Sequence, residues 1–99
     1  MSASNRRSME LDGVFDLNAA LALDRAVGSV KGEGSLVVNF RRVSDFHDVG
    51  LAVLARTIQR SREDLELDVR GLRDRQHQML RYFGVELAGH GYLGDVSSP

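Results

Sequence analysis

The sequence of 99 residues contains no cysteine, no tryptophan and one proline. Without cysteine there is neither a disulfide framework nor thiolate chemistry, an absence that suits a reducing compartment. No stretch approaches the ~20 consecutive apolar residues that a helix needs to cross a bilayer. Residues 1–7 also lack the apolar core of a secretory signal peptide. These absences predict a cytoplasmic protein with no membrane partner.

The chain also lacks an excess of either charge. Its 13 basic and 14 acidic residues give a net charge of −1. Broad nucleic-acid binding depends on a net positive field that neutralises phosphates, so this balance argues against a nucleic-acid partner. A hydrophobic content of 42% and a length of 99 residues indicate one ordinary globular domain.

Hydrophobic periodicity predicts short strands that alternate with helices. The expected strands cover residues 9–12, 36–40, 65–70 and 85–87. The expected helices cover residues 17–30, 48–60 and 73–83. Asp16 is placed to cap the first helix, and Gly84 to end the third.

This alternation predicts βαβ units with right-handed crossovers and a mainly parallel sheet. Polar residues at every second position of 65–70 predict that helices cover mainly one face of that sheet. The folded domain is expected at residues 9–88, between flexible tails at residues 1–8 and 89–99.

The most informative stretch covers residues 36–51 and reads L-V-V-N-F-R-R-V-S-D-F-H-D-V-G-L. It resembles the signature of the STAS domain family, which includes anti-sigma factor antagonists and the tails of sulfate transporters. In that family, a strand ending in D-L-S precedes x-V-x-x-x-D-S-S-G-L, and the second serine of the pair is phosphorylated to switch partner binding. Aligned without gaps, the two aspartates fall on Asn39 and His47, and the two serines fall on Asp48 and Val49.

The resemblance implies a single α/β domain with a small, mixed, mainly parallel sheet of about four to five strands and helices mainly on one face. An additional edge strand would come from the N-terminal tail. The resemblance also implies a non-enzymatic regulator that binds an anti-sigma factor or a related GHKL-type kinase in a bacterial cytoplasm. Gly50 matches the family pattern, whereas Val49 lacks the hydroxyl group that phosphorylation requires. Partner binding is therefore expected to be independent of phosphorylation at this loop.

The partner-binding surface is predicted to be the loop before the second helix together with the exposed face of that helix. Its expected residues are His47, Asp48, Val49, Gly50, Ala52, Arg56 and Arg60. Two interpretations of Val49 stay open: it docks a partner, or it packs against the sheet. Asp48 is interpreted as the N-cap of the second helix, in preference to a fixed mimic of phosphate. Exposed arginines on that helix favour an acidic partner surface.

The sequence predicts no catalytic activity, no metal site and no cofactor. His47 lacks the convergent ligands of a metal site, because His77 and His90 show no ligand spacing. Ser44 precedes it in an open loop without the elbow geometry of a nucleophile. His47 is therefore interpreted as a surface residue whose titration can tune partner binding with pH. Two other functions stay open: a degenerate STAS subunit of a homo-oligomer, such as a homodimer, and a small-molecule sensor.

Overall fold

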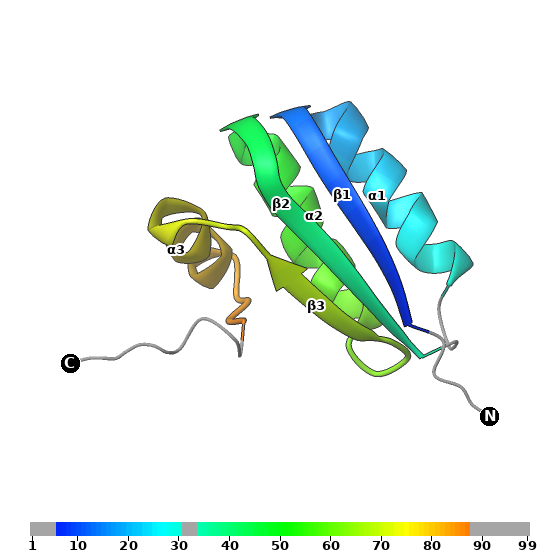
Figure 1. Cartoon of the computed structure of the whole chain (residues 1–99). Coiled ribbons are helices and arrows are strands. Elements are labelled where there is room, and N and C mark those ends of the chain that lie inside the picture. Colours follow the sequence, from blue (N-terminus) through cyan, green and yellow to red (C-terminus); the bar gives the residue numbers. More distant parts are fainter. Residues whose placement is uncertain (1–5, 31–33, 88–99) are drawn as a thin grey trace.

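The computed structural model describes residues 6–30 and 34–87 of the chain, in which strands and helices alternate (Figure 1). In chain order the elements are β1 (Arg6–Phe15), α1 (Leu17–Ser29), β2 (Ser35–Phe46), α2 (Asp48–Ser61), β3 (Glu66–Arg70) and α3 (Asp74–Tyr82). The three predicted helices are all present, and their ends lie within one residue of those expected.

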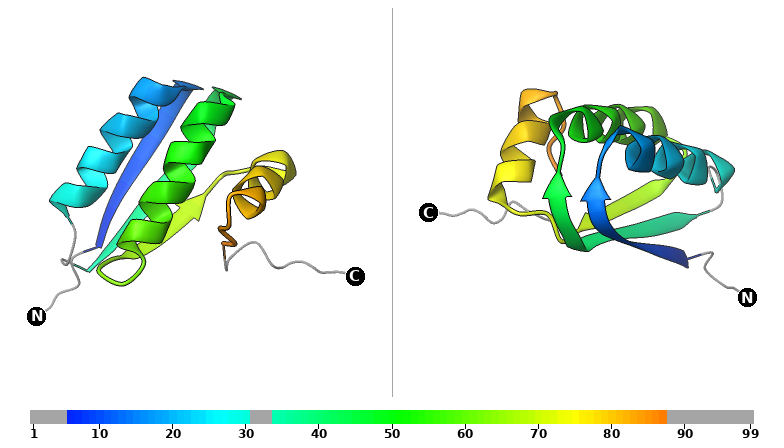
Figure 2. Two further views of the ribbon diagram at one scale, coloured as in Figure 1. Left: turned by 180° about the vertical axis from the view of Figure 1, so that it is seen from behind. Right: turned by 90° about the horizontal axis from the view of Figure 1, so that it is seen from above.

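The strands form one sheet in the order β1-β2-β3, and both neighbouring pairs are parallel. α1 connects β1 to β2, and α2 connects β2 to β3, as the predicted βαβ units require. Both helices lie side by side on the same face of the sheet (Figure 2). α3 follows β3 and packs beside α2 at one end of this layer.

The prediction of a mixed sheet with four to five strands is wrong for the described residues, which form three parallel strands. The strand expected at residues 85–87 does not form, and these residues follow the end of α3. Gly84 takes a positive φ of 92°, and the Val85 N–H donates to the Leu80 carbonyl over 2.8 Å. This bond closes the C-terminus of α3 and turns Val85 into the core, so the backbone does not extend beside β3.

β1 and β2 are longer than predicted. β1 begins at residue 6, so residues 6–8 belong to the sheet and not to a tail. β2 was expected to end at Phe40 but continues to Phe46. The register between the two strands shifts twice between Glu10 and Val14. Such bulges interrupt the alternation of buried and exposed residues, and the hydrophobic pattern of the sequence therefore predicted strands that are too short.

Several predictions concern residues outside the described part of the chain. They are the tails at residues 1–5 and 89–99, the additional N-terminal edge strand, and the position of His90.

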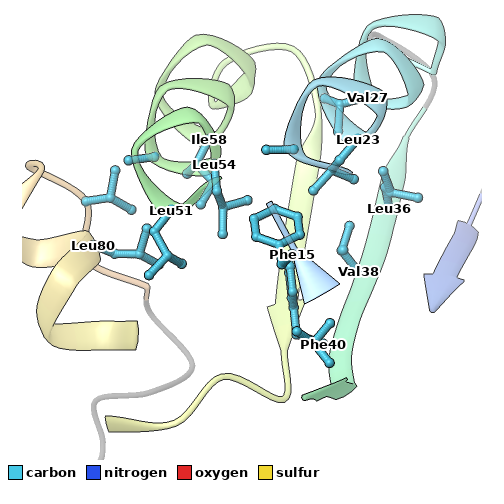
Figure 3. Packing of buried hydrophobic residues seen from close by; sticks show 14 of the residues in the cluster. Phe15, Leu23, Val27, Leu36, Val38, Phe40, Leu51, Leu54, Ile58 and Leu80 are labelled. Carbon is cyan, nitrogen blue, oxygen red and sulfur yellow. The ribbon is translucent and has the colours of Figure 1, made fainter. Parts of the chain in front are cut away.

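The core lies between the sheet and the helices (Figure 3). β2 contributes three alternate residues, Leu36, Val38 and Phe40, each at most 2% exposed. Phe15, at the end of β1, packs edge-on against Phe40 with ring centroids 5.0 Å apart. The helices complete the cluster with residues at helical spacing, chiefly Ala20, Leu23, Val27, Leu51, Leu54, Ala55, Ile58 and Leu80.

The opposite face of the sheet is polar and carries its own ion pairs. Arg42 Nη1 lies 3.7 Å from Glu10 Oε1, which links β2 to β1. On β3, the Arg70 guanidinium donates two hydrogen bonds to Asp68, and these raise the pKa of Arg70 above its usual value. This face offers little apolar area to bury, so the helices gather on the other one.

Gly50, in the first turn of α2, packs directly against the turn that joins β1 to α1. A Cβ atom added to Gly50 would lie 2.7 Å from the Phe15 carbonyl oxygen and 3.2 Å from that of Asp16. Both obstacles are backbone atoms, which cannot rotate away as a side chain can. The absence of a side chain at Gly50 therefore sets how closely α2 approaches the start of α1.

Replacing Gly50 by alanine is expected to lower the free energy of unfolding by about 1–3 kcal/mol, since the added methyl group displaces packed atoms. Gly28 is the matched control, because it lies in α1 with nothing within 4 Å of an added Cβ atom. Gly28→Ala should raise the free energy of unfolding by about 0.5–1 kcal/mol through helix propensity. Urea unfolding measures both changes, and an unaltered midpoint for Gly50→Ala would contradict the packing argument.

Candidate protein-binding surface

The loop before α2 lies at the carboxyl edge of the sheet, where β1 and β2 both end. Phe15 and Phe46 pair across the two strands. The His47 N–H then donates to the Phe15 carbonyl over 3.0 Å, which extends the ladder by one bond. This bond and the packing of Gly50 bring the N-termini of α1 and α2 together at one edge of the molecule.

Asn39, where the resemblance places the family's strand aspartate, has a local structural role. Its Oδ1 accepts the Arg41 N–H over 2.9 Å, at the bulge of β2. Gly71, which follows β3 with a φ of 85°, packs against the same region, since an added Cβ atom would lie 2.7 Å from Asn39 Oδ1. Asn39 therefore holds the irregular part of β2 in place beside the loop.

The interpretation of Asp48 as a helix cap is wrong. His47 is the N-cap residue of α2, and its side chain makes no capping hydrogen bond. Asp48 is the first residue of the helix, where the helix dipole stabilises a carboxylate. The cap predicted for α1 is confirmed, since Asp16 Oδ1 accepts the Ala19 N–H over 2.9 Å. The error arose because β2 extends to Phe46 and leaves His47 alone to turn the chain.

Alanine substitutions at the two aspartates should separate a cap from a dipole interaction. Asp16→Ala is expected to lower the free energy of unfolding by about 1 kcal/mol, because it leaves a helix N–H group without its acceptor. Asp48→Ala should cost roughly 0.3–0.5 kcal/mol at low salt, and less as salt is added. Thermal unfolding at two ionic strengths measures both; an Asp48→Ala cost that equals that of Asp16→Ala would restore the cap.

Val49 lies on the outer surface of α2 with 48% of its area exposed. The interpretation in which it packs against the sheet is wrong, because Gly50 and Leu51 occupy the buried positions of this turn. The part of an apolar side chain that stays exposed gains nothing from folding. Val49 is thus available for contact at the position where the resemblance places the family's phosphoserine.

The other predicted residues of this surface differ in accessibility. Arg56 is exposed and forms no ion pair with a described residue. Ala52 is half-buried on the same side of α2. Gly50 is buried beneath Val49, so it positions the surface without contributing a side chain to it.

Arg60 is held by α1. Its Nη2 donates to Asp24 Oδ1 over 2.7 Å, and the hydroxyl of the buried Thr57 donates to the same oxygen over 2.7 Å. One carboxylate of α1 therefore binds two residues of α2, and the sequence pattern gave no indication of Asp24. Because it is paired, Arg60 offers less free charge to a partner than Arg56 does.

The Thr57 hydroxyl should stabilise the helix pair more than the Arg60 guanidinium does. Thr57→Val removes a hydrogen bond from a buried hydroxyl to a partly exposed carboxylate and is expected to cost about 1.5 kcal/mol of unfolding free energy. Arg60→Ala removes a pair in which the arginine side chain is 57% exposed, and should cost less than about 1 kcal/mol. Chemical denaturation of both variants gives the order, and a larger loss for Arg60→Ala would reverse the assignment.

Three exposed apolar residues beside this loop were missed by the sequence analysis. Val14, Leu17 and Leu21 are 46%, 41% and 39% exposed. Val14 and Leu17 flank the Phe15–Asp16 turn against which Gly50 packs. The available signal was that Leu17 and Leu21 lie one helical turn apart, away from the buried stripe of Ala20, Leu23 and Val27.

His47 and Ser44, the residues considered above for metal binding and catalysis, each contact a neighbouring residue of the sheet. His47 Nε2 lies 3.6 Å from Asp45 Oδ2 at the surface, an ion pair only when the imidazole is protonated. No group of three or more His, Asp or Glu residues within residues 6–30 and 34–87 is arranged to hold a metal ion. The Ser44 hydroxyl donates to the Gly13 carbonyl over 3.0 Å, which leaves it as a link between strands.

A hollow of about 270 Å³ lies on the other side of the α2 N-terminus, between β2 and α3. Asp45 and Asp48 line it from one side, and Arg73 and Arg75 from the other. Its mixed charges suit a small polar molecule. This is the cleft near the second helix that a small-molecule sensor would require.

Comparison with known proteins identifies the family. The sequence model described as "Mlab, STAS domain" matches residues 2–89. The chain belongs to the STAS domain family. None of the curated protein sequences matches this chain with significance. In the described part of the chain, no helix combines the length and apolar character that a membrane span requires.

Two solved structures resemble this fold. The STAS domain of a SulP transporter from Vibrio cholerae is 22% identical, with a TM-score of 0.61 over 85% of this chain and 67% of that chain. A crystal structure of Mglu is 29% identical, with a TM-score of 0.58 over 64% of this chain. The match covers 17% of the Mglu chain, so the likeness concerns a part of that protein.

Proposed function

We propose that this chain is a non-enzymatic STAS regulatory domain that binds a partner protein through the loop before α2 and the outer face of α2. The side chains that would contact the partner are His47, Asp48, Val49, Ala52 and Arg56, with Arg60 at the far end and Gly50 beneath them. By the resemblance to anti-sigma factor antagonists, the partner is an anti-sigma factor or a related GHKL-type kinase of the bacterial cytoplasm.

The observation that carries this proposal is the exposure of Val49. Val49, 48% exposed in the first turn of α2, and Leu17, 41% exposed at the start of α1, both place apolar area in water at the edge where the two helices begin. Exposed apolar residues that cluster in this way are typical of protein–protein contact sites. The flanking Arg56 supplies a charge that the described residues leave unpaired.

Binding through this surface would be independent of phosphorylation at the loop. Val49 has no hydroxyl group, and Asp48 carries one negative charge where a phosphoserine carries about two. An aspartate therefore reproduces neither the charge nor the three acceptor oxygens of a phosphate. Control of binding would then come from the abundance of the two proteins.

Partner capture from a lysate of the source organism tests the proposal. The wild-type chain is expected to retain a GHKL-type protein, and Val49→Asp and Arg56→Glu are expected to release it. In a titration with that purified partner, each variant should weaken binding about tenfold or more, as loss of a central contact does. Phosphatase treatment of the chain should leave affinity unchanged.

Arg81→Glu is the matched control for Arg56→Glu, since Arg81 is also an exposed helical arginine but lies on α3. It should bind like the wild type. Gly50 variants are unsuitable here, because a side chain at Gly50 disturbs packing as well as the surface. If Arg56→Glu and Arg81→Glu retain the partner equally, the interface lies elsewhere.

The hollow between β2 and α3, beside the start of α2, favours a second function, the sensing of a small polar molecule. A ligand that binds there raises the stability of the folded chain by mass action. Thermal-shift screening detects this effect, and Arg75→Ala should abolish it. If no partner is captured and a ligand raises the melting temperature, the sensor replaces the partner-binding function. A dimer that forms with increasing concentration, in the absence of both a captured partner and a stabilising ligand, would instead favour the homo-oligomeric subunit.

A further inference from the structure

The exposed apolar residues of α1 lie along its junction with α2. Asp24 contacts Thr57 and Arg60, so it marks the edge of α1 that faces α2. Leu17 and Leu21 precede Asp24 at helical spacing, and the periodicity of the helix places all three along that edge. Leu17 and Leu21 therefore border α2 while a large part of each stays exposed.

The facing edge of α2 follows from the same contacts. Val53 and Val49 precede Thr57 by four and eight residues, which turns them about 40° and 80° away from the Thr57 edge toward the outer surface of α2. Val53 is half-buried against the core, and Val49 is exposed. Leu17, Leu21, Val49 and Val53 together are called the interhelical strip.

Two arginines flank the interhelical strip. Arg25 follows Leu21 by one turn of α1, and Arg56 follows Val53 by one turn of α2. Both are exposed, and neither forms an ion pair with any residue in the described ranges. The neighbouring carboxylate of Asp24 is already bound to Arg60 at 2.7 Å. The strip thus combines apolar area with uncompensated positive charge.

We propose that the interhelical strip binds an acidic amphipathic helix of the partner protein, an inference that rests on the proposed function. Apolar residues one turn apart on such a helix would pack on Leu21 and Val49. Carboxylates beside them would pair with Arg25 and Arg56, which would orient the helix along the strip. A helix is the fitting shape, because it can present apolar residues one turn apart on one face and carboxylates beside them.

Two other occupants fit the charges less well. In a symmetric contact with a second copy, each strip faces the same strip of the other chain, which brings the same two arginines and no unpaired carboxylate to pair with them. Like charges across an interface are unfavourable. Anionic membranes attract clusters of ~4–8 basic residues, whereas two flank this strip.

The full chain can select its own ligands from a phage-displayed library of random peptides that span about four helical turns. The selected peptides should be rich in Asp and Glu, with apolar residues at helical spacing. Leu21→Ser should weaken the tightest of these peptides about tenfold or more. Tyr82→Ser, which removes an apolar side chain that is 82% exposed on α3, is the matched control and should leave affinity unchanged. Circular dichroism checks that each variant is folded.

Charge reversal tests the acidic character separately. The double variant Arg25→Glu and Arg56→Glu should lose the selected peptide and bind a version of it in which Lys replaces each acidic residue. Selected peptides without acidic residues, or equal affinity for the double variant, would overturn the inference. Two further results would do the same: self-association of the wild-type chain that Leu21→Ser abolishes, and binding to phosphatidylserine vesicles that Leu21→Ser abolishes.

The failure of this inference differs from a failure of the proposed function. If Arg56→Glu releases the captured partner but the selected peptides bind elsewhere, partner binding stands and the acidic helix is wrong. If acidic peptides bind the strip while neither Val49→Asp nor Arg56→Glu releases any captured protein, the strip is a docking site for acidic helices, and the proposed function is wrong.

Discussion

The fold and the candidate surface both depend on one packing constraint, the absence of a side chain at Gly50. Because an added Cβ atom would lie 2.7 Å from the Phe15 carbonyl oxygen, α2 reaches its place beside α1 only with glycine there. The same carbonyl accepts the His47 N–H, and the next residue, Asp16, caps α1. One short turn therefore fixes the starts of both helices, and their side-by-side placement is what exposes Val49 next to α1.

Both faces of the molecule carry ion pairs, Asp24 with Arg60 on the helical face among them, and the faces differ in the apolar area that lies beside their charges. On the open face of the sheet, Glu10 with Arg42 and Asp68 with Arg70 satisfy one another, so a partner would have to separate existing pairs. On the helical face, Arg56 has no such pair among the described residues and lies beside exposed apolar area. Desolvating a charge is repaid only by a new partner of opposite sign, which favours the helical face for binding an acidic one.

Local signals in the sequence were sufficient for the helices and their ends, since Asp16 and Gly84 act within a single turn of chain. The strands were harder to predict, because the bulges of β2 depend on pairing with β1 and on the contact between Asn39 and Gly71, far apart in sequence. The cap of α2 was misplaced for the same reason. Of the candidate surface, the loop was predictable from the family pattern, whereas Leu17 and the pairing of Arg60 with Asp24 depend on how two helices pack.

A valine at the position where the resemblance places the family's phosphoserine would change the energetics of a binding surface as well as its regulation. A phosphoserine at the start of a helix would gain from the helix dipole and from nearby N–H groups, so it would favour the free, charged state of the domain. Valine has no such favourable state in water. A contact that covers its exposed apolar area would lower the free energy by roughly 25 cal/mol per Å² buried. A binding surface of this kind would favour contact at all times, and its occupancy would follow the concentration of the protein that fits it.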